Sequence, residues 1–390
     1  MATLSLIAEP FPDWEAPLHT AGAFDLVTAM AFTAPRSCSA RFLVARGSRT
    51  PEFASPKISV EVLPMRASSL PILWQSNATA RPLDGEMTHS VTPMMPLRAR
   101  NDDDGTQSTV TVPHALAWEA PELLAPAHAR LVRAFVKRAV KYADVIITTS
   151  HATASLLQQM YGYNLPVQVI PPIAPNVLLA GVDSAERRAR LGLPERYLVT
   201  TANDDEAGRL HWVYNALESD PSLPHVVVLT GLDPVPNRNS QGKGAPNKNA
   251  QNKGPQTDTL ESRVPERLRH RITVVSAEDL RDAGAVLSGA ALLVQPQSFA
   301  ATGYPVIAAL MSQVPVLHAG VDAIGEYVLD GGIAEPEALG FVTALSRLFI
   351  ASAGDGTSEL ERLTVQAADR GRTFSWESVA WQLWETHASI

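Results

Sequence analysis

The hydrophobic positions of the chain fall into two series of short apolar runs, separated by segments with helical spacing. The first series is LSLIAEPF, ARFLVARG, ISVEVLP, TVTVPHALAW, VIITTS and VQVIPP, and the second is YLVTTA, HVVVLTG, ITVVSA, AALLVQP, VPVLHAG and GGIAEP. Continuous apolar runs of this length are typical of parallel strands buried on both faces. Their alternation with helices predicts an α/β protein with two doubly wound, Rossmann-like parallel sheets.

Several intervening segments carry the periodicity of amphipathic helices. Residues 21–32, 127–144, 210–219, 277–289 and 305–313 are predicted helices, and Ser150 and Thr153 are candidate caps for another over 152–162. A last helix begins after Thr373 or Ser375. One face of this predicted helix is apolar and consists of Trp376, Val379, Ala380, Leu383 and Trp384. So much aromatic surface predicts that this helix packs against a large apolar surface.

Composition and charge narrow the functional classes. With 390 residues, 45% of them hydrophobic and 18% charged, the chain is long enough for two globular domains. A net charge of −8 argues against nucleic-acid or anionic-membrane binding. Cys38 is the sole cysteine, so no intrachain disulfide forms. The N-terminus lacks a basic region and no apolar run approaches about 20 residues. We expect a cytoplasmic protein without a transmembrane segment, with peripheral membrane association left open.

Some stretches give little structural signal. Residues 64–108 mix proline, serine and asparagine with isolated hydrophobic residues, and 233–261 is a polar segment that we expect to be a disordered insertion. Asp102, Asp103 and Asp104 follow a polar segment, so a solvated loop is favoured over a metal site. Zinc-hydrolase, nucleophile-elbow and P-loop patterns are absent from the sequence.

The most informative stretch spans 290–319 and predicts strand, loop, helix and strand. The loop runs from Phe299 to Tyr304 and contains Gly303, and Pro305 suits the first helical position because its missing N–H would be unpaired there anyway. Such a loop can bind a phosphate through backbone N–H groups and the helix dipole. A plain turn between strand and helix is the alternative.

Segments along the chain resemble the retaining nucleotide-sugar glycosyltransferases of GT-B fold known as family four. They are TVTVPHALAWEAPEL, KYADVIITTSHATASLLQQMYG, VQVIPP, RARLGLPERYLVTTA, AEDLRDAGAVLSGAALLVQP, GYPVIAAL, VPVLHAGVDAIGEYVLDGG and FSWESVAWQLW. The resemblance implies an acceptor-side domain over 1–172, a donor-side domain over 173–370 and a helix over 371–390 that crosses back. It also implies retaining, metal-independent hexosyl transfer, without a cofactor, from a nucleotide diphosphate sugar to a carbohydrate or lipid-linked acceptor.

The resemblance also assigns site residues, with departures from the family pattern. Its two glutamates correspond to Ala300 and Ala308, and Gly208 stands where a lysine is expected. The positions that remain as donor-binding candidates are Arg209, Thr302, Gly303, Tyr304 and Glu326; His114 is the catalytic candidate, and Gly22 and His89 are the acceptor-side candidates. Since the departures affect the donor site, a catalytically impaired GT-B protein that binds or regulates a protein partner stays as the alternative.

Overall fold

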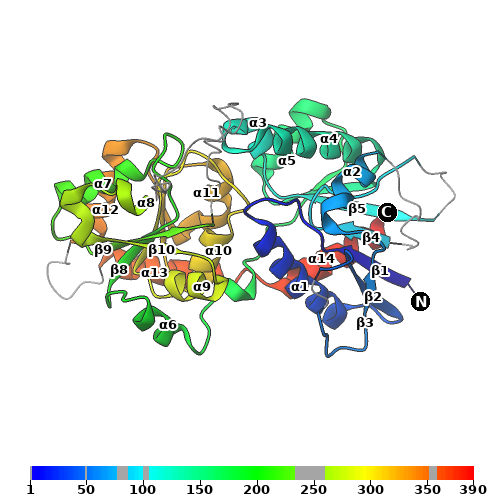
Figure 1. Cartoon of the computed structure of the whole chain (residues 1–390), viewed down its shortest axis with the longest axis horizontal. Helices are drawn as coiled ribbons and strands as arrows, with labels where there is room; N and C mark the ends of the chain where they lie inside the picture. Colours follow the sequence, from blue (N-terminus) through cyan, green and yellow to red (C-terminus); the bar gives the residue numbers. More distant parts are fainter. Residues whose placement is uncertain (1, 49–50, 77–86, 100–104, 233–259, 351–357) are drawn as a thin grey trace, which may run out of the picture.

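The computed structural model describes residues 2–48, 51–76, 87–99, 105–232, 260–350 and 358–390. Within them the chain forms two parallel sheets, which lie side by side along the long axis of the molecule (Figure 1). The first contains β1 (Ala2–Ile7), β2 (Cys38–Val44), β3 (Ile58–Val62), β4 (Met87–Ser90), β5 (Gln107–Val112), β6 (Val145–Thr148) and β7 (Val167–Val169). The second contains β8 (Tyr197–Thr200), β9 (His225–Thr230), β10 (Ile272–Ser276), β11 (Leu292–Gln295), β12 (Val316–His318) and β13 (Gly332–Ala334). The predicted α/β class with two Rossmann-like sheets is confirmed.

Both sheets have the strand order of a doubly wound fold. The orders are β3-β2-β1-β4-β5-β6-β7 and β10-β9-β8-β11-β12-β13, with every described pairing parallel. The strand order therefore reverses between β1 and β4 in the first sheet and between β8 and β11 in the second. In such sheets ligands bind at the carboxyl ends of the strands, at this switch point. The topology places the loops after β1, β4, β8 and β11 at the position of a binding site.

Helices cover both sheets and connect most of the strands. They are α1 (Ala16–Thr33), α2 (Leu70–Gln75), α3 (Leu116–Glu119), α4 (Pro126–Tyr142), α5 (His151–Tyr161), α6 (Ser184–Arg190), α7 (Leu210–Ser219), α8 (Leu260–Arg263), α9 (Leu280–Ser288), α10 (Tyr304–Met311), α11 (Asp322–Val328), α12 (Ala338–Leu348), α13 (Glu359–Gly371) and α14 (Trp376–Ser389). The hydroxyl of Ser150 accepts from the N–H of Thr153 and caps α5, as predicted. No helix in the described ranges has the length and apolarity that crossing a bilayer requires.

The last helix returns to the first half of the molecule. Figure 1 shows α14 beside α1, with both chain ends on the same half. Ser375 caps α14 by accepting from the N–H of Ser378, and the indole N–H of Trp384 donates to the carbonyl of Met30 in α1 (3.1 Å). Leu383 and Trp384 are buried in the apolar cluster between α1 and the first sheet. The predicted packing of this helix on a large surface is confirmed.

Two features differ from the sequence prediction or lie outside the described chain. The first helix begins at Ala16, five residues before the predicted start, because Pro17 is accommodated in its first turn. The expected insertion at 233–261 falls almost wholly outside the described residues, as do Asp102 to Asp104. The domain boundaries at 172 and 370 stay predictions.

Candidate functional site

The loop after β1 and the loop after β11 meet between the two sheets. Glu15 lies just before α1 and is buried, at 1% exposure. Its carboxylate accepts hydrogen bonds from the backbone N–H (3.1 Å) and the hydroxyl (2.8 Å) of Thr302 in the other half. The same carboxylate lies 3.4 Å from Nε2 of His19 and 3.4 Å from Nε2 of His114. Two imidazoles of the first half and one amide of the second therefore share a single carboxylate.

The environment of Glu15 stabilises its ionised form. Burial alone would raise the pKa of this carboxyl, because desolvation disfavours the charged state. The contacts with His114 and His19 outweigh burial and hold the pKa of Glu15 well below its usual range. A buried carboxylate is tolerated only when it is paired and hydrogen-bonded. The molecule consequently places a fixed negative charge beside the N-terminus of α10, where the helix dipole favours an anion.

The predicted phosphate-binding loop has the backbone geometry of a helix N-terminus. Gly303 precedes α10 with φ of 81°, and a Cβ there would lie 2.6 Å from Cε2 of Tyr327, so both conformation and space require glycine. The helix begins at Tyr304, one residue earlier than predicted. The Tyr304 hydroxyl lies 3.0 Å from Nδ1 of His19, so this loop contacts the first half through two residues. Backbone N–H groups in a first helical turn have no partner within the helix, which leaves them suited to an anion.

The two alanines at the expected glutamate positions are buried. Ala308 has no exposed surface and Ala300 is 7% exposed, and both belong to the apolar core of the second half. A carboxylate at position 308 would therefore lie among apolar side chains. The apolar packing around positions 300 and 308 therefore suits alanine and leaves no polar surroundings for a glutamate.

The segment after β8 departs from the family pattern for a steric reason. A Cβ on Gly208 would lie 2.3 Å from the carbonyl oxygen of Asn203, so this backbone has no room for the expected lysine. Arg209 follows with φ of 53°, and its guanidinium carbon lies 4.7 Å from the ring centroid of Trp212. Arg209 lines neither of the two pockets described below, whereas Thr302 lines the first and Gly303 the second.

Glu326 makes a second contact between the halves. Its carboxylate accepts from the backbone N–H groups of His151 (2.6 Å) and Ala152 (2.8 Å), at the N-terminus of α5. The neighbouring Tyr327 hydroxyl donates to the hydroxyl of Thr149 (3.2 Å). The Glu326 carboxylate thus accepts from N–H groups in the first turn of α5 that have no partner within the helix, and it does not face the loop before α10.

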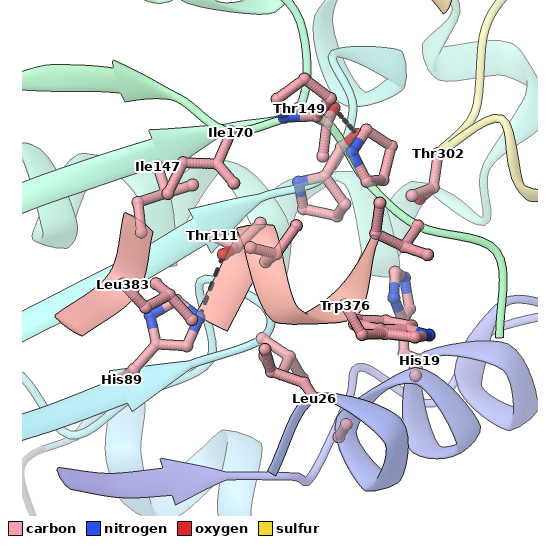
Figure 2. A pocket seen from close by; sticks show the side chains of 18 of the residues that line it. His19, Leu26, His89, Thr111, Ile147, Thr149, Ile170, Thr302, Trp376 and Leu383 are labelled. Carbon is pink, nitrogen blue, oxygen red and sulfur yellow. Dashed lines mark hydrogen bonds between the residues drawn. The ribbon is translucent and has the colours of Figure 1, made fainter. Parts of the chain in front are cut away.

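A pocket lies on one side of the Thr302–Tyr304 segment, between this segment and the first half of the molecule. Figure 2 shows His89, Ile147 and Leu383 at one side of it and Thr302 and His19 at the other. Its lining residues are His19, Gly22, Ala23, Leu26, His89, Val91, Thr111, Pro113, Ile147, Thr149, Ile170, Pro171, Pro172, Ile173, Thr302, Tyr304, Trp376, Val379 and Leu383. The structure therefore brings the acceptor-side candidates Gly22 and His89 together with Thr302 and Tyr304.

A second pocket lies on the other side of the same segment, at the carboxyl ends of β9, β11 and β12. Its lining residues are Glu15, Leu232, Gln295, Gln297, Phe299, Ala301, Gly303, Pro305, Val306, His318, Ala319, Val321 and Ile324. Burial lowers the pKa of His318 to about 4, so its imidazole is neutral at neutral pH. Neither pocket includes His114, which contacts the site through Glu15. In the described residues no group of histidine, cysteine and carboxylate side chains has the geometry of a metal site.

Sequence reasoning missed Glu15 and His19. Glu15 lies in the proline-rich stretch PFPDWEAP, which the sequence indicates as a loop, and His19 lies between that stretch and the predicted helix over 21–32. Residues 15 and 19 have the i, i+4 spacing of neighbours on a helix, and that spacing is the one local signal that could have identified them.

Similarity to solved structures extends over the whole chain. Sucrose-phosphate synthase from Thermosynechococcus elongatus superposes with a TM-score of 0.69 at 18% identity, covering 100% of this chain and 99% of that one. A glycosyltransferase from Rickettsia africae gives 0.64 at 10% identity, with 100% and 98% covered. HepE from Anabaena, solved with UDP and glucose, gives 0.62 at 15% identity, with 100% of both chains covered. No protein-family model and no curated protein sequence matches. The chain has the two-domain GT-B fold, as predicted.

Proposed function

We propose that this protein is a glycosyltransferase that moves a hexosyl group from a nucleotide diphosphate sugar to a hydroxyl of a carbohydrate or lipid-linked acceptor. One observation carries the proposal. The loop at the N-terminus of α10 in one half meets the buried Glu15 cluster of the other half, and a pocket lies on each side of the contact. The GT-B fold and the UDP and glucose bound by HepE support a nucleotide sugar as the donor.

The donor diphosphate would bind at the backbone N–H groups of Thr302, Gly303 and Tyr304. Because Glu15 already accepts from the Thr302 amide, a phosphate oxygen competes with this carboxylate for the same donor. The like charges of Glu15 and a diphosphate would also repel each other. Donor binding therefore requires Glu15 to withdraw, and a small separation of the two halves achieves this. In this proposal the amides and Arg209 neutralise the departing diphosphate, so that no metal is required. The proposed transfer retains the configuration of the anomeric carbon, as the family resemblance implies.

His114 is the proposed acceptor-side base. Its Nε2 lies 3.4 Å from Glu15, and its Nδ1 accepts from the N–H of Leu116 (3.4 Å). Because Nδ1 accepts from Leu116, the ring proton lies on Nε2 toward Glu15, so His114 can accept a proton at Nε2 only after this contact opens and the ring changes tautomer. Glu326 and Arg209 complete the proposed donor set, and each would leave its present partner to reach the nucleotide sugar. Gly22 and His89 belong to the acceptor pocket.

Isothermal titration calorimetry with UDP, GDP and their sugars tests the donor site. We expect micromolar binding of at least one nucleotide, weakened by about tenfold or more in Arg209→Ala, because a hydrogen bond to a charged group contributes about 1.5–3 kcal/mol and about 1.4 kcal/mol is tenfold in Kd. Arg347→Ala is the matched control, since Arg347 pairs with Glu359 on the outer helices α12 and α13. Transfer is then measured as nucleotide release with and without EDTA, and the anomeric configuration of the product by NMR.

Absence of binding by every nucleotide and nucleotide sugar at millimolar concentration would refute the transferase proposal. The remaining interpretation would then be a GT-B protein that binds a protein partner without catalysis. A pulldown with the intact chain, followed by identification of the captured protein, would test that outcome.

A further inference from the structure

The pocket between β4, β5, α1 and α14 is unusual for a sugar site because its lining contains no aspartate, glutamate, lysine or arginine. His19, which also lines it, already faces the carboxylate of Glu15. The pocket is partly open to solvent. Leu26, Ile147, Ile170 and Leu383 form an apolar side away from Thr302 in Figure 2. This side suits the apolar part of a ligand.

Apart from Trp376, the polar side chains of this wall already have hydrogen-bonding partners within the protein. His89 contacts the hydroxyls of Thr109 through Nδ1 (2.9 Å) and Thr111 through Nε2 (3.3 Å), and the second contact is drawn in Figure 2. Thr149 donates to the carbonyl of Pro113 (2.6 Å). Burial is the main reason that the pKa of His89 is lowered to about 3, so this imidazole is uncharged at neutral pH. Few of these groups are left to pair with the hydroxyls of a sugar ring.

For a sugar, the free-energy cost of removing its hydroxyls from water would therefore exceed the gain from binding in this pocket. Each hydroxyl that leaves water without finding a partner costs about 1–3 kcal/mol, and a hexose carries several. An apolar group of the same size gains about 25 cal/mol per Å² of buried surface. The chemistry of the wall selects a hydrocarbon or aromatic group over a carbohydrate.

One donor in the wall does lack a partner. The indole Nε1 of Trp376 is buried and makes no hydrogen bond with any described residue. The ring of Trp376 packs against Gly22, where an added Cβ would lie 3.4 Å from Cη2 of Trp376. Because Nε1 is shielded from solvent in this conformation, a ligand oxygen reaches the indole N–H only if the ring turns.

We infer that this pocket binds an apolar alcohol, with its hydroxyl toward Thr302 and Tyr304 and its hydrocarbon or aromatic body between α1, α14 and the first sheet. The inference rests on the proposed glycosyl transfer for the alcohol's role as acceptor, and it selects the apolar class among the acceptors named above. The hydroxyl end lies beside Thr302 and Tyr304, which belong to the loop proposed to hold the donor.

Contact quenching of tryptophan fluorescence tests this site without nucleotide or turnover. The chain has seven tryptophans, so Trp376→Phe isolates the signal from the pocket. Trp381→Phe is the matched control, because Trp381 lies on the same helix and is 57% exposed. Bromo-octanol and bromobenzyl alcohol are the probes, which separates aliphatic from aromatic bodies. Glucose is the competitor, and circular dichroism verifies that each variant is folded.

We expect saturable quenching by at least one probe that persists in Trp381→Phe and falls by more than half in Trp376→Phe. Val379→Asn, a partly exposed position in the wall, should weaken the probe about tenfold, because it places an amide against the apolar body. Glucose should not displace the probe. Quenching that does not saturate, that survives equally in Trp376→Phe, or that glucose reverses would overturn the inference. The quenching measurement involves no nucleotide sugar, so a negative result leaves the transferase proposal standing. A failure of every nucleotide to bind would likewise leave the binding of an apolar alcohol to this pocket standing.

Discussion

Replacing Glu15 by glutamine is expected to destabilise the protein through the contact between its halves. Glutamine keeps the size of the side chain but removes the charge that faces Thr302, His19 and His114. It also directs an NH₂ group at either the Thr302 amide or an imidazole. Hydrogen bonds to a charged group contribute about 1.5–3 kcal/mol each, and disrupting a buried charged network costs about 3–5 kcal/mol. We therefore expect the free energy of unfolding to fall by about 3–5 kcal/mol.

Differential scanning calorimetry converts this estimate into a temperature. An unfolding entropy of about 2.1 cal/mol/K per residue gives about 0.8 kcal/mol/K for 390 residues, so the Tm should fall by roughly 4–6 °C if the halves unfold together. Glu61→Gln is the control. Its carboxylate pairs with Arg41 on the surface, where such pairs contribute about 0–1 kcal/mol.

The effect of Glu15 should also depend on pH. Since the folded-state pKa lies below the ordinary value of 4.5, its stabilising contribution is complete above that pH and decreases as the pH falls further. The stability difference between wild type and Glu15→Gln should therefore be full at pH 7 and shrink below pH 4.5. A difference of less than about 0.5 kcal/mol at pH 7, the usual range for a surface change, would refute the reasoning.

Three further substitutions test the site and the core. Gly303→Ala should lose about 2 kcal/mol or more in urea unfolding, because it combines positive-φ strain with a clash against Tyr327; Gly47→Ala, at φ of 88° with nothing within 4 Å, isolates the strain and should lose less. Ala308→Glu should cost about 3–5 kcal/mol because its charge is buried, and Ala308→Gln should cost less; equal losses would show that volume dominates. Burial lowers the pKa of His89 to about 3, so stability should fall as the pH drops from about 6.5 towards 3, by about 2 kcal/mol at pH 5, and His89→Asn should flatten this slope in denaturant titrations.

The apolar pattern predicts most of the fold because parallel strands buried on both faces are continuous apolar runs. The strand β4 escapes this rule. Its sequence MTHS is mainly polar, yet it lies between β1 and β5 in the first sheet. His89 is tolerated there because Thr109 on β5 supplies a hydrogen-bonding partner. The pairing of β4 with β5 depends on a side chain of the neighbouring strand, so the apolar pattern of the β4 segment alone does not predict it.

The candidate site was predictable only where its geometry is local. Gly303 and Pro305 lie within three residues of each other and are typical of the start of a helix, so the sequence alone predicted the loop before α10. The partner of Thr302 is Glu15, 287 residues earlier in the chain, and no local pattern connects them. The contacts of Glu326 with the N-terminus of α5 likewise join segments that lie far apart in the sequence.

The return of α14 to the first half has a consequence for how the chain folds during synthesis. Leu383 and Trp384 complete the apolar cluster that Val27 and Met30 of α1 begin, yet the ribosome makes the entire second sheet between them. The apolar face of α1 in the nascent first half therefore stays exposed to solvent until the last helix emerges. A chaperone that binds apolar segments would have its longest opportunity on α1, and loss of the last helix alone would leave that face permanently open to aggregation.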